Sequence, residues 1–283
     1  MRKLLVILFL ALLPLQAGAR SRYEGMTAQE AFASIGSALS DKTSLSVSDL
    51  TVEVALLMLD TPYVAGTLEV EPEALVVRYD ATDCILFAET CLATALTLKG
   101  VNLAVAGCCT DTPSYSLLCD NLRMLRYRDG VVGYATREHY TSDWLRNAAA
   151  LGVLKEYSGE VGEPKEQKFS FMSTHPGSYR QLAENPELVE EIRAVEESLE
   201  KSEYHWVPAD MLEGAEDYVR SGDIVCFVTK VEGLDISHVA VAYEKDGRKC
   251  FIHASSAAGK VILDGRSIAE YAKYGVRLAR PLR

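Results

Sequence analysis

The spacing of apolar residues divides this 283-residue chain into a helical first part and a strand-rich last part. In four segments apolar side chains recur at intervals of three and four, which predicts four helices. These segments are 27–39, 48–59, 83–98 and 113–127. Thr27 and Ser48 stand at the starts of the first two helices, where N-cap residues belong. Lys99-Gly100 ends the third helix with a glycine exit.

Between the two parts the pattern is less regular. It weakens from residue 131 to 171, although residues 139–144 resemble a helix start. Residues 180–202 are charged, amphipathic and rich in Glu, which predicts a helix with a solvated face rather than an interaction site.

After Asp210 the chain changes to short runs rich in Val, Ile and Phe, separated by turns that contain glycine. The predicted strands are 223–228, 238–243, 250–253 and 261–263. Glu244-Lys245-Asp246-Gly247 is a hairpin turn. Helices followed by an antiparallel meander predict an α+β fold in which the helices pack on the sheet.

The amino terminus has the features of a secretory signal. Arg2 and Lys3 precede an apolar run over residues 4–15, and the small residues 17–19 form a cleavage site. We therefore expect a signal peptide over residues 1–19, export to a periplasmic or extracellular space, and one elaborated domain over residues 20–283. The apolar run is short for a membrane span, so we expect no stable membrane insertion.

The charge of the chain narrows its partners. The formal net charge is −11, and loss of Arg2 and Lys3 with the signal would change it by two, to about −13. Such an acidic surface argues against nucleic acid and anionic lipid as partners. It identifies no substrate, and the sequence leaves the oligomeric state open.

Seven cysteines are an odd set, so at least one thiol of an exported protein should be unpaired, and Cys84 is the candidate. Cys108, Cys109 and Cys119 are close enough in sequence for a local disulfide. The remaining cysteines fall in apolar segments and are interpreted as small buried hydrophobes. They are Cys91, Cys226 and Cys250. The chain has no CxxC pair and no HExxH motif, so we expect neither a zinc site nor a cofactor.

Cys84 lies where a loop meets a predicted helix. Residues 61–69 form a loop punctuated by Pro62 and Gly66, and the stretch Asp80–Glu89 leads into the helix. A thiol in the first helical turn faces unpaired backbone N–H groups and the positive end of the helix dipole, which favours the thiolate. This position is typical of a cysteine nucleophile.

A cysteine nucleophile needs a base and a group that orients the base. His238 begins one predicted strand and His253 ends the next, and the hairpin between them should bring these ends together. We expect His238 to project from the sheet toward a facing helix. A single histidine at a strand end is usually structural, but together the three residues predict Cys84 as nucleophile, His238 as base and His253 as orienting group.

Several motifs occur in a recognisable order from about Ser48 to the C-terminus. They are Thr61-Pro62-Tyr63 with Gly66, Asp83-Cys84, His139-Tyr140 with Trp144, His175 with Tyr179, Gly222-Asp223-Ile224, Leu234-Asp235-Ile236-Ser237-His238 and Ile252-His253-Ala254. This set resembles the N-acetylmuramoyl-L-alanine amidase-like family, within the NlpC-type branch of the papain-like cell-wall cysteine hydrolases.

The resemblance implies a papain-like α+β fold, in which a helix-rich part carries the cysteine and packs on an antiparallel sheet that carries the histidines. It implies hydrolysis of the amide bond between N-acetylmuramic acid and L-Ala, with peptidoglycan or its soluble muropeptides as substrate. Cys84 would attack the lactyl carbonyl, His238 would carry the proton to the leaving amine, and the Cys84 backbone N–H would help to hold the oxyanion. Tyr63 resembles the family's tyrosine beside the thiol, and Asp83 the acidic residue near a substrate amine.

The residues expected to contact substrate are Tyr63, Asp83, His139, Tyr140, Trp144, His175, Tyr179 and Ser237. The aromatic members suit stacking on a sugar or a peptide. The alternative for His139 and His175 is that they cap loops. The chain also departs from the family pattern, because Ile85 and Leu86 are apolar where many relatives carry Ser-Gly, or Thr at the second position.

Two other functions stay open at this point. One is an endopeptidase of the same fold that cuts within the stem peptide, and the other is a catalytically silent protein that binds wall fragments. The presence of the cysteine and both histidines argues against the silent protein.

Overall fold

The structure is a computed structural model that describes residues 21–105, 108–109 and 112–282. The predicted signal segment lies outside these residues. No helix within the described part of the chain combines the length and the hydropathy needed to cross a membrane.

The four predicted helices are present. They are α1 (Ala28–Ala38), α2 (Val47–Leu57), α3 (Cys84–Leu98) and α4 (Tyr115–Arg126). Thr27 caps α1 as predicted, in a capping box with Glu30. The prediction that Ser48 caps α2 is wrong, because the Ser46 hydroxyl accepts the hydrogen bond from the Asp49 backbone N–H and the helix begins two residues earlier.

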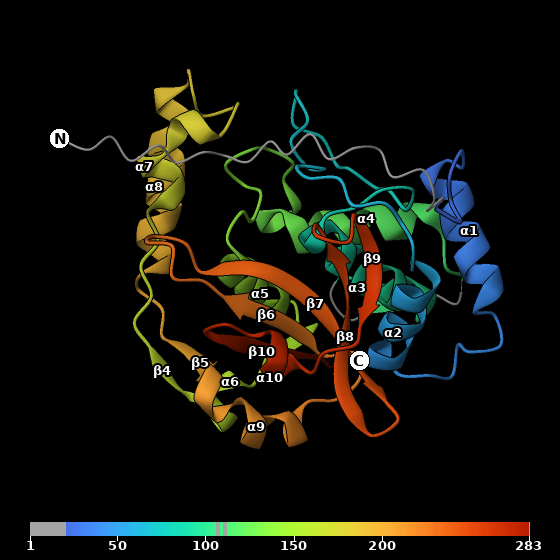
Figure 1. The fold of residues 1–283 in the computed structure, drawn as a ribbon. Coiled ribbons are helices and arrows are strands. Elements are labelled where there is room, and N and C mark those ends of the chain that lie inside the picture. Colours follow the sequence, from blue (N-terminus) through green and yellow to red (C-terminus); the bar gives the residue numbers. More distant parts are fainter. Residues whose placement is uncertain (1–20, 106–107, 110–111, 283) are drawn as a thin grey trace.

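The remaining helices cover the middle and the end of the chain. They are α5 (Thr141–Ala150), α6 (Ser158–Val161), α7 (Phe171–Thr174), α8 (Pro186–Leu199), α9 (Leu212–Ala215) and α10 (Ile268–Tyr271). The charged helix begins later than predicted, because Asn185 caps α8 and Pro186 takes its first position. In the view of Figure 1, α7 and α8 lie at one side of the molecule, and α1 and α2 at the other.

Eight strands of the described chain form an antiparallel sheet in the order β4-β5-β10-β6-β7-β8-β9, with β3 also pairing with β10. Their bounds are β3 (Leu154–Glu156), β4 (Glu163–Lys165), β5 (Tyr204–Pro208), β6 (Ile224–Val228), β7 (Ile236–Lys245), β8 (Arg248–Ser255), β9 (Lys260–Asp264) and β10 (Gly275–Pro281). The strands β6 to β9 match the prediction. A separate pair joins β1 (Val101–Asn102) to β2 (Cys108–Cys109).

Alternation along the strands gives the sheet two buried faces. Val239 of β7 and Ile252 of β8 belong to the larger core, which α2, α3 and α4 complete. Ala240 and Phe251, their neighbours in sequence, point the other way into a second core closed by α9 and α10. The expected α+β architecture is therefore present, and α3 lies against β7 and β8 (Figure 1).

Candidate active site

A pocket of about 260 Å³ lies where the first turn of α3 meets the start of β7. Cys84 and Asp83 line it from the helix, and Ser237 and His238 line it from the strand. The chain segment that contains His139 forms another part of its wall. The sequence motifs around the cysteine and the first histidine therefore meet in one cavity.

Cys84 is the first residue of α3 and is partly exposed. Burial and the nearby Asp83 carboxylate raise the pKa of its thiol to about 11, although the backbone N–H groups of Val239, Cys84 and Ile85 favour the thiolate. The Val239 contribution places the sulfur beside the start of β7. The backbone N–H groups at the helix start favour the thiolate as predicted, but desolvation outweighs them. The expected net preference for the thiolate is therefore wrong.

Both carboxylate oxygens of Asp83 accept hydrogen bonds from the protein. One carboxylate oxygen accepts the Leu86 backbone N–H at 2.9 Å, which caps α3. The other accepts the backbone N–H of Thr67 at 3.2 Å and its hydroxyl at 2.6 Å. Asp83 therefore ties the loop over residues 61–69 to the nucleophile helix, and its oxygens already have protein partners before any substrate amine arrives.

The two predicted histidines are neighbours. Nε2 of His238 lies 2.6 Å from Nδ1 of His253, and the two rings meet edge to face. Burial and the neighbouring His253 lower the pKa of His238 to about 3, and burial lowers the pKa of His253 to about 4. Both imidazoles are therefore neutral near pH 7.

His238 does not project toward the helix that faces the sheet. It stacks on Phe227, on the face that also carries Phe251 and Tyr271, because residue 238 has the same parity along β7 as Ala240. Among the described residues, the Cys84 sulfur makes no hydrogen bond to either imidazole. Cys84 and His238 both line the same pocket.

One further acidic residue adjoins the pair. Oδ2 of Asp264, at the end of β9, lies 3.4 Å from Nε2 of His253, and Arg266 binds both oxygens of that carboxylate. The sequence analysis missed Asp264. The signal that could have found it is the strand pairing, because His253 pairs with Ile262 and the chain places Asp264 two residues on, at the same edge.

Four of the residues expected to contact substrate line the pocket in addition to Asp83. They are His139, Tyr140, Tyr179 and Ser237. Nε2 of His139 contacts the Tyr134 carbonyl oxygen at 2.8 Å, and burial lowers the pKa of this imidazole to about 3. The Tyr140 hydroxyl donates to the buried Glu196 carboxylate at 2.6 Å. These side chains are fixed parts of the wall.

The other three expected residues do not line the pocket. Trp144 is fully buried in the larger core and does not line the pocket, because helical spacing from α5 directs it inward. His175 stacks on Phe171 with ring centroids 4.4 Å apart, also away from the pocket. Tyr63 is half-buried close to Cys84 and Asp83, which together with burial raise the pKa of its phenol.

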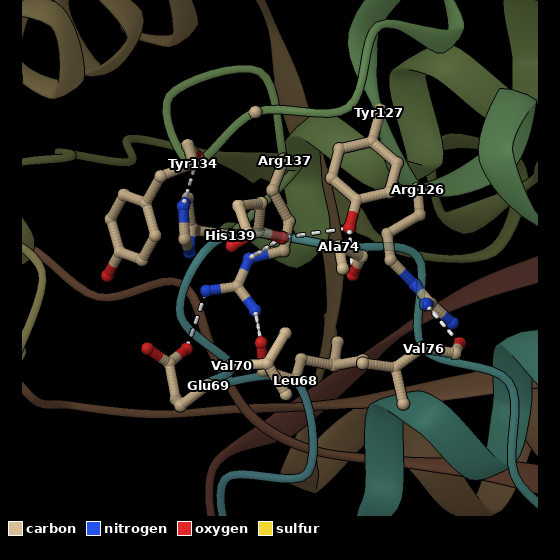
Figure 2. A network of polar contacts seen from close by, with 12 residues as sticks. Leu68, Glu69, Val70, Ala74, Val76, Arg126, Tyr127, Tyr134, Arg137 and His139 are labelled. Atoms are coloured by element: carbon tan, nitrogen blue, oxygen red, sulfur yellow. Dashed lines mark hydrogen bonds and ion pairs between the residues drawn. The ribbon is translucent and has the colours of Figure 1, made fainter.

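Buried arginines hold the loop whose residues Leu68 and Glu69 line the pocket. Figure 2 shows this network of polar contacts. Arg137 donates to the Leu68 carbonyl oxygen at 2.5 Å and forms an ion pair with Glu69 at 2.6 Å. Arg126 donates to the Val76 carbonyl oxygen at 2.6 Å. Arg126 ends α4, and Arg137 lies between α4 and α5. Arg137, distant in sequence, therefore fixes residues 68 and 69, which line the pocket together with Cys84.

The cysteines other than Cys84 divide into buried and surface groups. Cys91, Cys226 and Cys250 are buried and free, as predicted, and Cys119 is also free, so it forms no local disulfide. The side chains of Cys108 and Cys109 lie outside the described residues. Within the described part of the chain, no group of three His, Cys, Asp or Glu side chains is arranged to hold a metal ion.

Comparison with solved structures places this geometry among known proteins. A crystal structure of an N-acetylmuramoyl-L-alanine amidase from Bacteroides uniformis is 33% identical, covers 84% of this chain and 99% of its own, and has a TM-score of 0.76. A Bacteroides fragilis structure named as a candidate xylanase is 34% identical over 80% of this chain and 98% of its own, with a TM-score of 0.71. A Legionella pneumophila protein, 20% identical over 90% of this chain and 95% of its own, shares the fold, with a TM-score of 0.64.

The sequence itself matches a family profile over most of its length. No curated protein matches the chain. The profile of a family described as N-acetylmuramoyl-L-alanine amidase-like matches residues 53–275, which include the pocket, both histidines and Asp264. The family resemblance expected from the motifs is confirmed, and the chain belongs to the N-acetylmuramoyl-L-alanine amidase-like family.

Proposed function

We propose that the protein is an exported cysteine hydrolase that cleaves the amide bond between N-acetylmuramic acid and L-Ala in peptidoglycan fragments. The observation that carries this proposal is the pocket in which a cysteine at a helix start meets the His238–His253 pair. Such an arrangement, with a thiol at a helix start and an imidazole on a sheet lining one pocket, also favours the papain-like placement within the NlpC-type branch.

The proposed reaction has two steps. In the first, the thiol proton passes to His238, the sulfur attacks the lactyl carbonyl carbon, and the C–N bond breaks as the amine takes the proton from His238. The stem peptide leaves with a free N-terminal L-Ala. In the second, water attacks the thioester with His238 as base, and the muramic acid carboxylate is released as the thiol is restored.

The resting protonation states suit this order of events. The thiol has a pKa of about 11 and His238 one of about 3, so both are neutral near pH 7. The proton therefore moves during attack rather than before it. Catalytic hydrogen bonds in enzymes without substrate are often long and tighten in the complex, so we expect substrate to bring the thiol and His238 together.

A backbone N–H group is available to stabilise the developing oxyanion. The backbone N–H of Cys84 lies in the first turn of α3, where such groups have no partner within the helix. A carbonyl carbon bonded to the sulfur would place its oxygen near this N–H and near the positive end of the helix dipole.

The name of the Bacteroides fragilis relative raises glycoside hydrolysis as a second possibility. That chemistry requires one proton-donating carboxyl and one free carboxylate on either side of the bond. In this pocket the Asp83 oxygens are engaged by Thr67 and Leu86. Glu69 and Glu89 form ion pairs with Arg137 and Arg126. Of the four carboxyl groups that line the pocket, Glu138 is the one without a hydrogen-bond partner among the described residues. Glycoside hydrolysis needs two available carboxyl groups, so this lining favours the amidase.

Defined muropeptides test the proposal. The full chain and Cys84→Ala are incubated with disaccharide peptides that differ in stem length and in the presence of an anhydro sugar end, and with xylo-oligosaccharides. We expect mass spectrometry to show an intact sugar and a peptide with N-terminal L-Ala, formed only by the unsubstituted protein. Cleavage inside the stem would identify an endopeptidase, release of xylose units a glycosidase, and binding without turnover a silent binding protein.

A further inference from the structure

The contact between the two imidazoles couples their tautomers. Two ring nitrogens 2.6 Å apart share one proton, so either His238 Nε2–H donates to His253 Nδ1, or His253 Nδ1–H donates to His238 Nε2. In the first state His238 Nδ1 and His253 Nδ1 carry the lone pairs. In the second state His238 Nδ1 carries a proton and cannot take one from the thiol.

The other ring nitrogen of His253 faces a carboxylate. Nε2 of His253 is buried, and its nearest acidic atom is Oδ2 of Asp264 at 3.4 Å. Asp264 is itself 5% exposed. In the first state an N–H points at this carboxylate, and in the second a lone pair does. The first state is favoured, because a lone pair facing a buried anion is repelled by it.

We propose that Asp264 is a positioning residue that selects the tautomer of His253 and, through it, leaves Nδ1 of His238 free to accept the proton from Cys84. This inference rests on the proposed function for its catalytic consequence. It adds to the cysteine and the two histidines a residue that touches neither substrate nor sulfur.

Arg266 competes with His253 for the same carboxylate. Its Nε and Nη2 donate to the two oxygens at 2.9 and 2.6 Å, and its backbone N–H donates to Oδ1 at 3.0 Å. Among the described residues Nε2 of His253 has no hydrogen-bond partner, because Arg266 holds the Asp264 carboxylate 3.4 Å away. His253 therefore receives the electrostatic part of the interaction. Arg266 thus weakens the coupling. Its side chain is more than half exposed, which makes it replaceable.

Other titratable groups face the pair as well. Cys84 and Asp83 approach from α3, and Tyr271 approaches from α10 with its ring 5.6 Å from His253 and 6.0 Å from His238. Burial raises the pKa of Tyr271, and that of the thiol is raised too, so both are neutral near pH 7. Of the groups beyond the pair, Asp264 and Arg266 are the charged ones that act on His253.

Two substitutions should act in opposite directions. Asp264→Asn removes the charge that raises the pKa of His253, and its amide can donate to Nε2, which stabilises the wrong tautomer. An Asp→Asn change behind a triad histidine costs about 10⁴-fold elsewhere, and with an imidazole in between we expect on the order of 10²-fold in kcat. Arg266→Gln frees the carboxylate to turn to His253, so the acidic limb of the pH–rate profile should move to higher pH.

The tautomer can also be read without turnover. In ¹⁵N-histidine-labelled Cys84→Ala protein, long-range ¹H–¹⁵N NMR spectra should show His253 protonated at Nε2, and Asp264→Asn should move that proton to Nδ1. Arg248→Gln, which removes another exposed arginine near α10, is the matched control for Arg266→Gln. His253 protonated at Nδ1 in the parent, or no change in Asp264→Asn, would overturn the inference. If the spectra behave as expected but muropeptides are not cleaved, the proposed function fails and the positioning role stands.

Discussion

His238 and His253 lie 15 residues apart in sequence, and their ring nitrogens are 2.6 Å apart across the hairpin of β7 and β8. The contact gives each imidazole a defined orientation in an aromatic surround of Phe227, Phe251 and Tyr271. An orienting group matters to a base chiefly through geometry and tautomer.

Replacing the orienting histidine should therefore lower turnover more than binding. We expect His253→Gln to lower kcat on muropeptides on the order of 10²-fold with little change in KM, because Nε2 of His238 loses its defined partner. His175→Ala, which removes a histidine outside the pocket, is the control. Equal losses in the two variants would show that His253 has no special role.

The thiol should behave as an ordinary or weaker acid until substrate arrives. With its pKa raised to about 11, Cys84 should be alkylated by iodoacetamide slowly at pH 7, and the rate should rise about tenfold per pH unit up to pH 10. A Cys119→Ser background removes the other partly exposed thiol among the cysteines whose side chains the structure describes. A rate that levels off below pH 8 would instead indicate a preformed thiolate.

Asp83 has two separable effects, one electrostatic and one structural. Asp83→Asn keeps an N-cap but removes the charge that raises the pKa of the thiol, so alkylation of Cys84 at pH 8 should become faster at little cost in stability. Asp83→Ala also loses the cap and the bonds to Thr67, and should reduce the free energy of unfolding by at least about 1 kcal/mol. Urea denaturation of both variants separates the effects, and equal stabilities would contradict the capping role.

Local patterns predicted the helices and the strands β6 to β9 because each of these elements has a regular apolar period. No strand was predicted at β10, although it lies inside the sheet between β5 and β6. Its apolar residues Val276 and Leu278 are separated by the charged Arg277. Arg277 is in fact 3% exposed and forms an ion pair with Glu156 of β3. Arg277 can be buried because an ion-pair partner from a sequence-distant strand neutralises its charge. A local sequence pattern does not contain that partner.

The candidate site likewise has features that local sequence predicts and features that depend on tertiary packing. The placement of Cys84 at a helix start and of His238 beside His253 could be predicted, because a helix start and a hairpin are local signals with fixed geometry. The pKa of the thiol could not, because it depends on how deeply tertiary packing buries the sulfur. Trp144 was expected in the groove because it is aromatic and follows the His139-Tyr140 motif, and only the packing of α5 shows that it belongs to the core.

Glu138 should make the free energy of unfolding depend on pH. Its side chain lines the pocket and is 7% exposed, and neither carboxyl oxygen has a hydrogen-bond partner in the part of the chain that the structure describes. Burial, reinforced by the carboxylates of Asp143 and Glu89, raises the pKa of Glu138 to about 10. A buried carboxyl without partners is costly to the folded state once it must ionise.

The sign of its pH dependence follows from linkage. Between about pH 4.5 and 10 the unfolded chain has lost this proton and the folded chain retains it, so the folded state loses stability as pH rises through that window. Glu138→Gln removes the loss. In urea denaturation, the free energy of unfolding of Glu138→Gln should therefore exceed that of the parent by an amount that grows from pH 5.5 to pH 8.5. Glu197→Gln, at an exposed position on α8, should show the same pH dependence as the parent. A constant difference across that range would mean that Glu138 ionises normally in the folded protein.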